Sequence, residues 1–376
     1  MRRAGYIVIF LCCAISAFSQ DPLNKPVRRQ PFIQLNYHSG SFWSRSEYLQ
    51  EQFSEPYKAI EARFGLQSTG TELWQQYHRY PKYGFGIHYS DLVKNLADTT
   101  IGNPLSIFIF YSGPWVRFGR FTLATDISFG LSYMQRIYDP VTNPYNDVIA
   151  SHVNLYFNLN MNLGFSISKR MDLYAGYGLT HYSNGRIQQP QKGVNNWGWT
   201  LGLSYLINEP VAEFIYREAP EFLSSEWIQL MYAVGIVEED GREDAVQGYY
   251  FTSSFTADYV YQFSTKMAVT MGMDVLYDNS LGLSIPGIPE DEVSTWQKTY
   301  LASHMGWQYI IHRFRFVMNF GTYFRQHSYD RGFWFIRAGG RVRFTDHLSG
   351  HICIKSKNGI RSDWVEWGLA LSLKVR

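Results

Sequence analysis

Residues 152–168 carry the pattern that most limits how this chain can fold. Every odd-numbered position from Val153 to Ile167 is apolar, and the even-numbered positions between them hold Asn, Tyr, Gly or Ser. Alternation with a period of two describes an extended strand with one apolar and one polar face. About 10 residues of such a strand cross a bilayer, and strands of soluble sheets are usually shorter than this segment. The segment therefore predicts a strand of a transmembrane β-barrel.

Two segments in the second half of the chain, 314–325 and 334–344, alternate in the same way. Their polar positions include several arginines, namely Arg315, Arg325, Arg337, Arg341 and Arg343. An arginine on an otherwise apolar membrane strand is tolerated only where that face borders water inside the barrel. We therefore expect a lumen that is polar and partly basic.

Similar patterns along the rest of the chain raise the expected number of strands to about fourteen to sixteen. The further candidates are 31–39, 83–91, 104–118, 120–134, 171–183, 196–208, 227–239, 248–264, 267–279, 298–312, 348–357 and 364–375. Because an unpaired sheet edge is not tolerated in lipid, we expect an all-β fold, a closed antiparallel transmembrane β-barrel. Between the first two candidates, Ser54 and the sequence after it, up to Gly65, predict a short capped helix. Residues 45–80 as a whole are open as a loop insert, a periplasmic element or a plug.

A weak internal duplication divides the chain into two parts. Residues 171–185 and the Trp-Gly strand after them resemble residues 345–359 and the strand after those. We expect a first barrel half at 21–208, a connection at 209–226 and a degenerate second copy at 227–376. One barrel of two halves and two small tandem barrels are both open. We favour one barrel, because no soluble domain or separate linker surrounds the last strand.

Residues 1–20 have the anatomy of a cleavable secretory signal, with two arginines ahead of an apolar run that is too short to span a bilayer as a helix. An exported barrel of this kind is expected in the bacterial outer membrane. Loss of Arg2 and Arg3 takes the formal net charge from +2 to 0 (2 − 2), so no basic surface indicates a nucleic-acid partner. Cys353 is then the one cysteine left, which excludes a disulfide within the chain.

The end of strand 171–183 holds the residues that point to chemistry. His181 and Ser183 lie two residues apart and share the apolar face of that strand, so both are expected to point toward lipid. An imidazole and a hydroxyl placed in this way act as general base and nucleophile. Asn195 opens the next strand on the same side, and in an antiparallel hairpin its carbonyl is expected to fix the imidazole tautomer.

The loop and strand that follow supply candidates for contacts with a transition state and a substrate. Asn184, or a backbone N–H of the Asn-Gly loop such as that of Gly185, is expected to stabilise an oxyanion. The candidates for substrate contacts are Arg186, Lys192, Trp197 and Trp199. The alternatives are that the two cations are solvated loop charges and that the tryptophans belong to the interfacial aromatic girdle.

The sequence HYSNGRIQQPQKGVN at 181–195 resembles the active-site segment of the PagL-type lipid A 3-O-deacylases, which are acyloxyacyl hydrolase-like enzymes. In that family a His-x-Ser-Asn motif ends a strand, and a Gln-Pro and a Gly precede the third catalytic residue. The resemblance implies an outer-membrane serine ester hydrolase that removes an acyl chain from lipid A. It makes His181 the base, Ser183 the nucleophile and Asn184 an oxyanion-hole residue. The chain departs from the family at the third member, where Asn195 stands in place of a glutamate.

The third member is similar instead to that of outer-membrane phospholipase A, whose His-x-Ser-Asn-Gly-Arg motif matches residues 181–186. That resemblance implies a glycerophospholipid substrate, calcium dependence and dimerisation, none of which the PagL type requires. The expected partners are therefore a membrane lipid and no nucleic acid, with the chain a monomer or a homodimer. We expect no cofactor, apart from calcium under the phospholipase hypothesis. A non-catalytic porin or transport barrel is the alternative of a different class.

Other histidines are expected to be structural. His88 and Ser90 form a second His-x-Ser pair, but the apolar residues beside them turn this pair toward the lumen. His304 and His351 are isolated on their strands, and no cluster has the spacing of a transition-metal site. The sequence therefore predicts no metal site.

The second copy is expected to lack chemistry. In it, Lys355 and Lys357 take the places of His181 and Ser183, so no base and no nucleophile remain.

Overall fold

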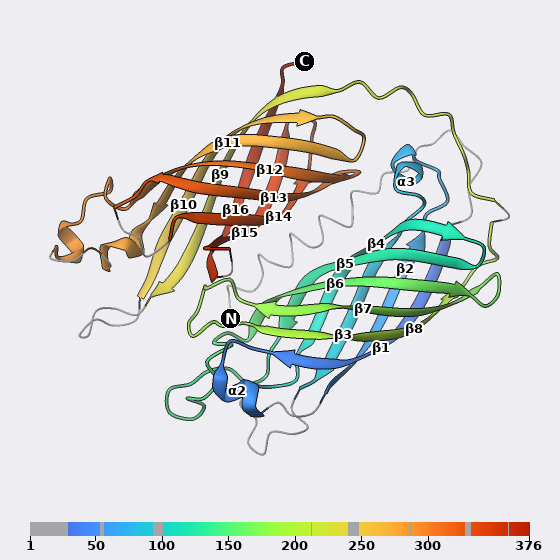
Figure 1. Cartoon of the computed structure of the whole chain (residues 1–376), viewed down its shortest axis with the longest axis horizontal. Coiled ribbons are helices and arrows are strands. Elements are labelled where there is room, and N and C mark those ends of the chain that lie inside the picture. The colour runs from blue at the N-terminus through green and yellow to red at the C-terminus, as the bar shows by residue number, and fades with distance from the viewer. Residues whose placement is uncertain are drawn as a thin grey trace.

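The computed structural model describes residues 29–52, 56–92, 101–211, 213–239, 248–283, 285, 288–327, 332–359 and 361–376 (Figure 1). Its elements are β1 (Gln30–Trp43), α2 (Glu47–Gln52), β2 (Tyr57–Gln67), α3 (Leu73–Tyr77), β3 (Lys82–Asp91), β4 (Leu105–Phe118), β5 (Phe121–Tyr133), β6 (Val153–Ser166), β7 (Met171–Ser183), β8 (Val194–Leu206), β9 (Ser225–Glu239), β10 (Gly248–Gln262), β11 (Met267–Asp278), η1 (Asn279–Leu283), η2 (Glu290–Glu292), β12 (Thr299–Ile311), β13 (Phe314–Arg325), β14 (Trp334–Arg343), β15 (Leu348–Lys357) and β16 (Arg361–Lys374). The expected signal at residues 1–20 lies outside the described residues.

The strands close into two antiparallel barrels of eight strands each, as Figure 1 shows (β1–β8 and β9–β16). The expected strand number, the antiparallel pairing and the closure are confirmed, but the preference for a single barrel was wrong. The reason lies in the register of β8, which pairs with β1 from Phe32↔Leu206 to Trp43↔Asn195. Both edges of the first sheet are thereby used, so no edge is left to accept β9. β16 closes the second barrel on β9 in the same way.

Side chains alternate between the lipid-facing wall and the lumen as the pattern predicts. In β6, Leu159 and Met161 are 40% and 55% exposed, whereas Asn158 and Asn160 between them are buried inside the barrel. The exposed apolar residues recur around both barrels and form the surface that faces hydrocarbon. No helix in the described part of the chain is long and apolar enough to cross a membrane.

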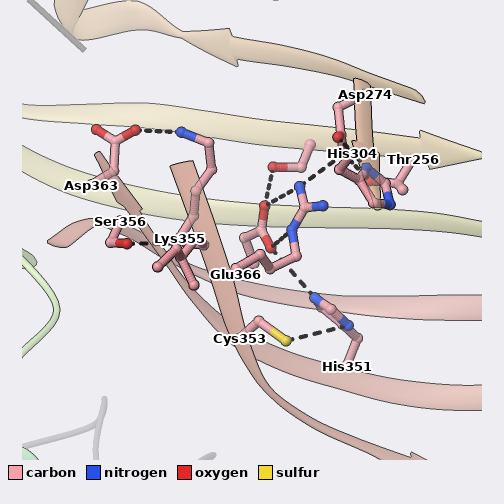
Figure 2. A network of polar contacts seen from close by, with 12 residues as sticks. Thr256, Asp274, His304, His351, Cys353, Lys355, Ser356, Asp363 and Glu366 are labelled. Carbon is pink, nitrogen blue, oxygen red and sulfur yellow. Dashed lines mark hydrogen bonds and ion pairs between the residues drawn. The ribbon is translucent and has the colours of Figure 1, made fainter. Parts of the chain in front are cut away.

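Charged, polar and aromatic side chains fill both lumens. In the second barrel Arg337 contacts Glu366 through Nε at 2.6 Å and Asp274 at 2.9 Å, and Asp274 also bonds His304 (Figure 2). The predicted arginines therefore lie at inward-facing positions of β13 and β14, and carboxylates pair with Arg337 and Arg341. An eight-stranded barrel has an interior just wide enough for its own side chains. The open channel of a porin is not compatible with such packing.

In both barrels most long loops lie at one end and most short turns at the other, and the connection at 68–81, which contains α3, is an exception at the turn end. The turns at 119–120 and 312–313 each join two strands within two residues, whereas the loops at 134–152 and 279–298 are much longer. Outer-membrane barrels have short periplasmic turns and longer extracellular loops. The two barrels therefore have the same orientation across the membrane, and the loop between β7 and β8 lies on the extracellular side.

The short helix expected over residues 54–65 was wrong, because Tyr57–Gln67 form β2. In this strand Glu61 and Arg63 point into the lumen, while Ile60 and Phe64 face outward. β1 pairs with one edge of β2 and β3 with the other. The two ladders and the burial of both charges override the local helix signal.

Candidate active site

The candidate residues meet on the outer wall of the first barrel, at the loop end of β7 and β8. His181 lies directly opposite Asn195 in the β7–β8 pairing, and Ser183 lies opposite Leu155 of β6. Leu155 belongs to the outward-facing set of β6, so Ser183 and His181 share the lipid-facing side of the sheet. The parity predicted from the sequence is thus the parity in the structure.

A hydrogen bond joins the imidazole of His181 to the side chain of Asn195. The Nδ1 of His181 lies 2.7 Å from the Oδ1 of Asn195, and Asn195 is itself held by its amide group, which donates to the carbonyl of Trp43 at 3.4 Å. An amide oxygen only accepts, so Nδ1 carries the proton in this contact. Nε2 is then the nitrogen with the free lone pair, as a general base requires.

The hydroxyl of Ser183 is buried beneath the β7–β8 loop and accepts two hydrogen bonds. The backbone N–H of Gly185 donates to its Oγ at 3.1 Å, and the Nε2 of Gln191 donates at 2.7 Å. Among the described residues no hydrogen bond joins this hydroxyl to His181. The two side chains are neighbours on one strand face, and catalytic hydrogen bonds often form only when substrate is bound.

Gln191 was not predicted from the sequence. It lies in the loop, where no strand parity indicates the direction of a side chain. The Gln-Pro-x-x-Gly spacing of this loop was the one available signal, and it points to a family resemblance but not to a contact with Ser183.

Asn184 has a different role from Gly185 in the loop. Its amide group donates to the Oγ of Ser151 at 2.9 Å and to the carbonyl of Gln188 at 3.0 Å, and its Oδ1 accepts from the backbone of Arg186. These contacts hold the turn after β7 in place and occupy the amide donors. The backbone N–H of Gly185 is the donor that points at Ser183, which favours Gly185 over Asn184 at the oxyanion position.

Gly185 satisfies two conditions that other residues do not. Its φ is +67°, a left-handed value that glycine adopts without steric cost. A Cβ at this position would also collide with Val365 of β16 in the second barrel. Glycine thus allows the backbone to carry its N–H to Ser183 while the loop packs against the neighbouring barrel.

The rim of the second barrel holds this loop on its other side. Arg186 forms an ion pair with Glu239 and lies 3.5 Å from a carboxylate oxygen of Asp363. The backbone N–H of Gln189 donates to Glu238 at 2.5 Å, and the Gln189 side chain donates to the Glu238 carbonyl at 2.7 Å. The guanidinium of Arg186, a candidate for a substrate contact, is therefore paired with carboxylates of the second barrel.

The other candidates for substrate contacts lie around the same site. Lys192 pairs with Asp147 of the β5–β6 loop. Trp197 and Trp199 are 43% and 67% exposed on the outer wall of β8. The ring centre of Tyr177 lies 6.4 Å from that of Trp197 and 5.0 Å from that of Trp199. This position fits both an aromatic girdle and a wall for acyl chains.

The remaining histidine, serine and lysine candidates face the lumens. His88 and Ser90 are fully buried inside the first barrel, as predicted. Lys355 also points inward and pairs with Asp363 (Figure 2). Lys355 shares one side of β15 with the buried residues His351 and Cys353, so it does not occupy the lipid-facing place of His181.

Two family models match the chain, one in each barrel. A model described as lipid A 3-O-deacylase (PagL) matches residues 58–204, and one described as acyloxyacyl hydrolase, C-terminal domain, matches residues 226–375. None of the curated proteins compared with the chain matches it.

Several solved structures are also similar to the chain. Neisserial surface protein A (NspA) is 11% identical with a TM-score of 0.32 and covers 46% of this chain and 96% of its own. The outer membrane enzyme PagL is 13% identical with a TM-score of 0.30 and covers 45% of this chain and 97% of its own. The monoaromatic hydrocarbon channel CymD is 10% identical with a TM-score of 0.20, and the match covers 93% of this chain and 88% of CymD.

Proposed function

Since the chain belongs to the PagL-type family of lipid A 3-O-deacylases and acyloxyacyl hydrolases, and is an outer-membrane lipid A deacylase, we propose that Ser183, His181 and Asn195 carry out its reaction. The observation that carries this assignment is the hydrogen bond between His181 and Asn195 on the lipid-facing wall. An amphiphile in the bilayer reaches that wall without leaving the membrane. A water-soluble ester would have to enter the membrane to reach the same wall.

In the first half of the reaction the Oγ of Ser183 attacks the ester carbonyl carbon of an acyl chain. The hydroxyl proton passes to Nε2 of His181, and Asn195 holds the opposite nitrogen as the donor of a hydrogen bond. A negative charge develops on the former carbonyl oxygen. The N–H of Gly185 and the amide of Gln191 donate to Oγ of Ser183 in the resting site. The oxyanion is attached to the carbon that bonds to this Oγ, so these two donors are near enough to shift onto it.

Collapse of the tetrahedral intermediate breaks the ester bond. The sugar oxygen leaves with the proton that His181 holds, and the acyl chain stays on Ser183 as an ester. Water then attacks this ester with His181 again as base, which releases a free fatty acid and restores the hydroxyl. Asn195 is neutral and does not offset the charge of the imidazolium, so its contribution is to orient the ring.

The assignment predicts that Ser183→Ala abolishes removal of the acyl chain while the barrel still assembles. The measurement is mass spectrometry of lipid A from cells that produce the wild-type chain, the variant or neither. Wild-type cells are expected to show lipid A lighter by one acyl chain, and variant cells the unmodified mass. Deacylated lipid A in cells that produce Ser183→Ala would contradict the assignment.

A glycerophospholipid is the second candidate substrate, because an asparagine at position 195 resembles the phospholipase pattern. An assay of the purified chain in mixed micelles, with a chelator and then with added calcium, distinguishes lipid A from glycerophospholipid as the substrate. Release of fatty acid from lipid A in the chelator is expected. Release from phospholipid alone, and only with calcium, would favour the phospholipase.

A further inference from the structure

The lumen of the first barrel contains three potential metal ligands from three neighbouring strands. His38 of β1, Glu61 of β2 and His88 of β3 place one ligand atom each within 4.8 Å of one another. Their side chains are buried, and the Nε2 of His38 lies 3.7 Å from the Oε2 of Glu61. Barrel register produces the cluster, because Glu61 lies opposite His88 in the β2–β3 pairing.

The three atoms that converge have no hydrogen-bond partner among the described residues. These are the Nε2 of His38, the Nε2 of His88 and the Oε2 of Glu61. A buried polar atom without a partner costs about 1–3 kcal/mol, so three at one point need a physical explanation. A bound cation is one, since each of these atoms is a lone-pair donor aimed at the same space.

The other ring nitrogens of the two histidines contact groups that orient the rings. The Nδ1 of His38 lies 2.8 Å from the Oγ1 of Thr200, and the Nδ1 of His88 lies 3.4 Å from the hydroxyl of Tyr182. If each Nδ1–H donates to the neighbouring hydroxyl, the lone pair is left on Nε2. Ligating histidines usually have an outer partner of this kind.

The remaining groups at the cluster balance its charge. The Oε1 of Glu61 accepts from Asn36 at 2.5 Å and from Arg63 at 2.6 Å, and Arg63 also bonds Asp126. Glu61 and Asp126 together outnumber the one guanidinium by one formal charge. Oε2 of Glu61 therefore stays available for a cation while Oε1 is held in place.

We propose that His38, Glu61 and His88 bind one divalent transition-metal ion, of the zinc type, inside the first barrel. Two imidazoles and a carboxylate are a ligand set that zinc uses, with water at a remaining position. Ligands of a tetrahedral zinc lie roughly 3.3 Å apart, given bonds of about 2.0–2.1 Å, so the side chains close in slightly on the ion. The ion would join β1, β2 and β3 next to the seam where β8 closes the barrel.

The test measures metal directly on the full chain. The chain is unfolded in denaturant with a chelator and refolded in detergent with Zn²⁺, Co²⁺ or Ca²⁺. Folding is checked by the difference in gel mobility between heated and unheated samples. Bound metal is then counted by elemental analysis, and the Co²⁺ sample is examined for visible absorption bands. His38→Gln with His88→Gln is the test variant, and His347→Gln, at an exposed turn of the second barrel, is the matched control.

We expect one equivalent of Zn²⁺ or Co²⁺ on the wild type and on His347→Gln, and a background level on the double variant. Calcium is expected to bind none of them, because a site with two imidazoles prefers softer ions. Background metal on the folded wild type would overturn the proposal, as would a full equivalent on the folded double variant. If the double variant does not fold, the count and the Co²⁺ spectrum of the wild type alone decide. None of these readouts depends on deacylation.

Discussion

At the scale of single residues, the side chain of Gln191 holds the hydroxyl of Ser183 in place. It donates to Oγ of Ser183, the proposed nucleophile, from a loop that also packs against the second barrel. Its place beside the N–H of Gly185 gives the reacting oxygen two donors from different parts of the loop.

We predict that Gln191→Ala lowers kcat for deacylation by about 10²-fold, the usual cost of losing one oxyanion donor. KM is expected to change little, because the donor acts on charge that develops in the transition state. Steady-state kinetics in mixed micelles measures both constants. Gln188→Ala, three positions earlier in the same loop, is the control and keeps the wild-type kcat. Equal kinetics for Gln191→Ala and wild type would remove Gln191 from the account.

Residue-scale prediction from the sequence worked where a strand fixed the direction of the side chain. Counting by twos placed His181 and Ser183 on the outer wall and Asn195 opposite His181. It did not reach Gln191, because a loop has no such parity. It also missed the cluster around Glu61, because three strands meet there through registers that a sequence does not show.

At the scale of elements, α3 joins the two barrels at the turn end. His78, which follows α3, lies 3.0 Å from the hydroxyl of Tyr309, and its Nε2 donates to the carbonyl of Ile310 at 2.8 Å. Tyr111 of the first barrel contacts the same ring at 2.9 Å. The ring therefore connects β4 with the end of β12.

Burial lowers the pKa of His78 to about 4, although the hydrogen bond to Ile310 opposes this and Lys266 adds to it. The neutral ring is the form that fits the folded contact. Its contribution to stability is therefore full above the unfolded pKa of 6.5 and is lost as the pH falls from 6.5 toward 4.

We predict that the Tm difference between wild type and His78→Gln shrinks over that interval, since glutamine does not titrate. Thermal unfolding in detergent at a series of pH values checks this. A Tm difference that is constant from pH 7.5 to 4 would show that protonation of this ring is not linked to stability.

Element types were predictable wherever alternation was strict, as in β6 and β13. The failure at β2 has a physical cause. Its inward face includes Tyr57 and Ala59 and its outward face includes Lys58, so the strand does not show the polar and apolar alternation of β6. The inward charges Glu61 and Arg63 are balanced in part by Asp126 of β5, a partner that is far away in the sequence.

On the scale of the whole molecule, two closed barrels share one orientation and meet at both ends. From the sequence we expected a duplication and a dividing segment, but the sequence did not indicate that eight strands already close. Closure depends on register between β1 and β8, two segments far apart in the chain. The second barrel contacts the β7–β8 loop through Glu238 and Glu239.

We predict that a chain ending at residue 208 still folds into a barrel, because none of its strand pairings involves the second barrel. Heat-dependent gel mobility in detergent measures this. Its deacylation rate is expected to fall below that of the full chain, because the loop loses its contacts with Glu238 and Glu239. A truncated chain that stays unfolded would mean that the barrels depend on each other for assembly.

The central claim is that a serine on the lipid-facing wall is the nucleophile. A long-chain alkyl fluorophosphonate tests it, because the serine oxygen displaces fluoride and keeps the phosphonate. Peptide mass spectrometry of the labelled protein is expected to locate the adduct on Ser183 in the wild type and to find none in His181→Ala. An adduct on another serine, or equal labelling of Ser183 without His181, would contradict the account.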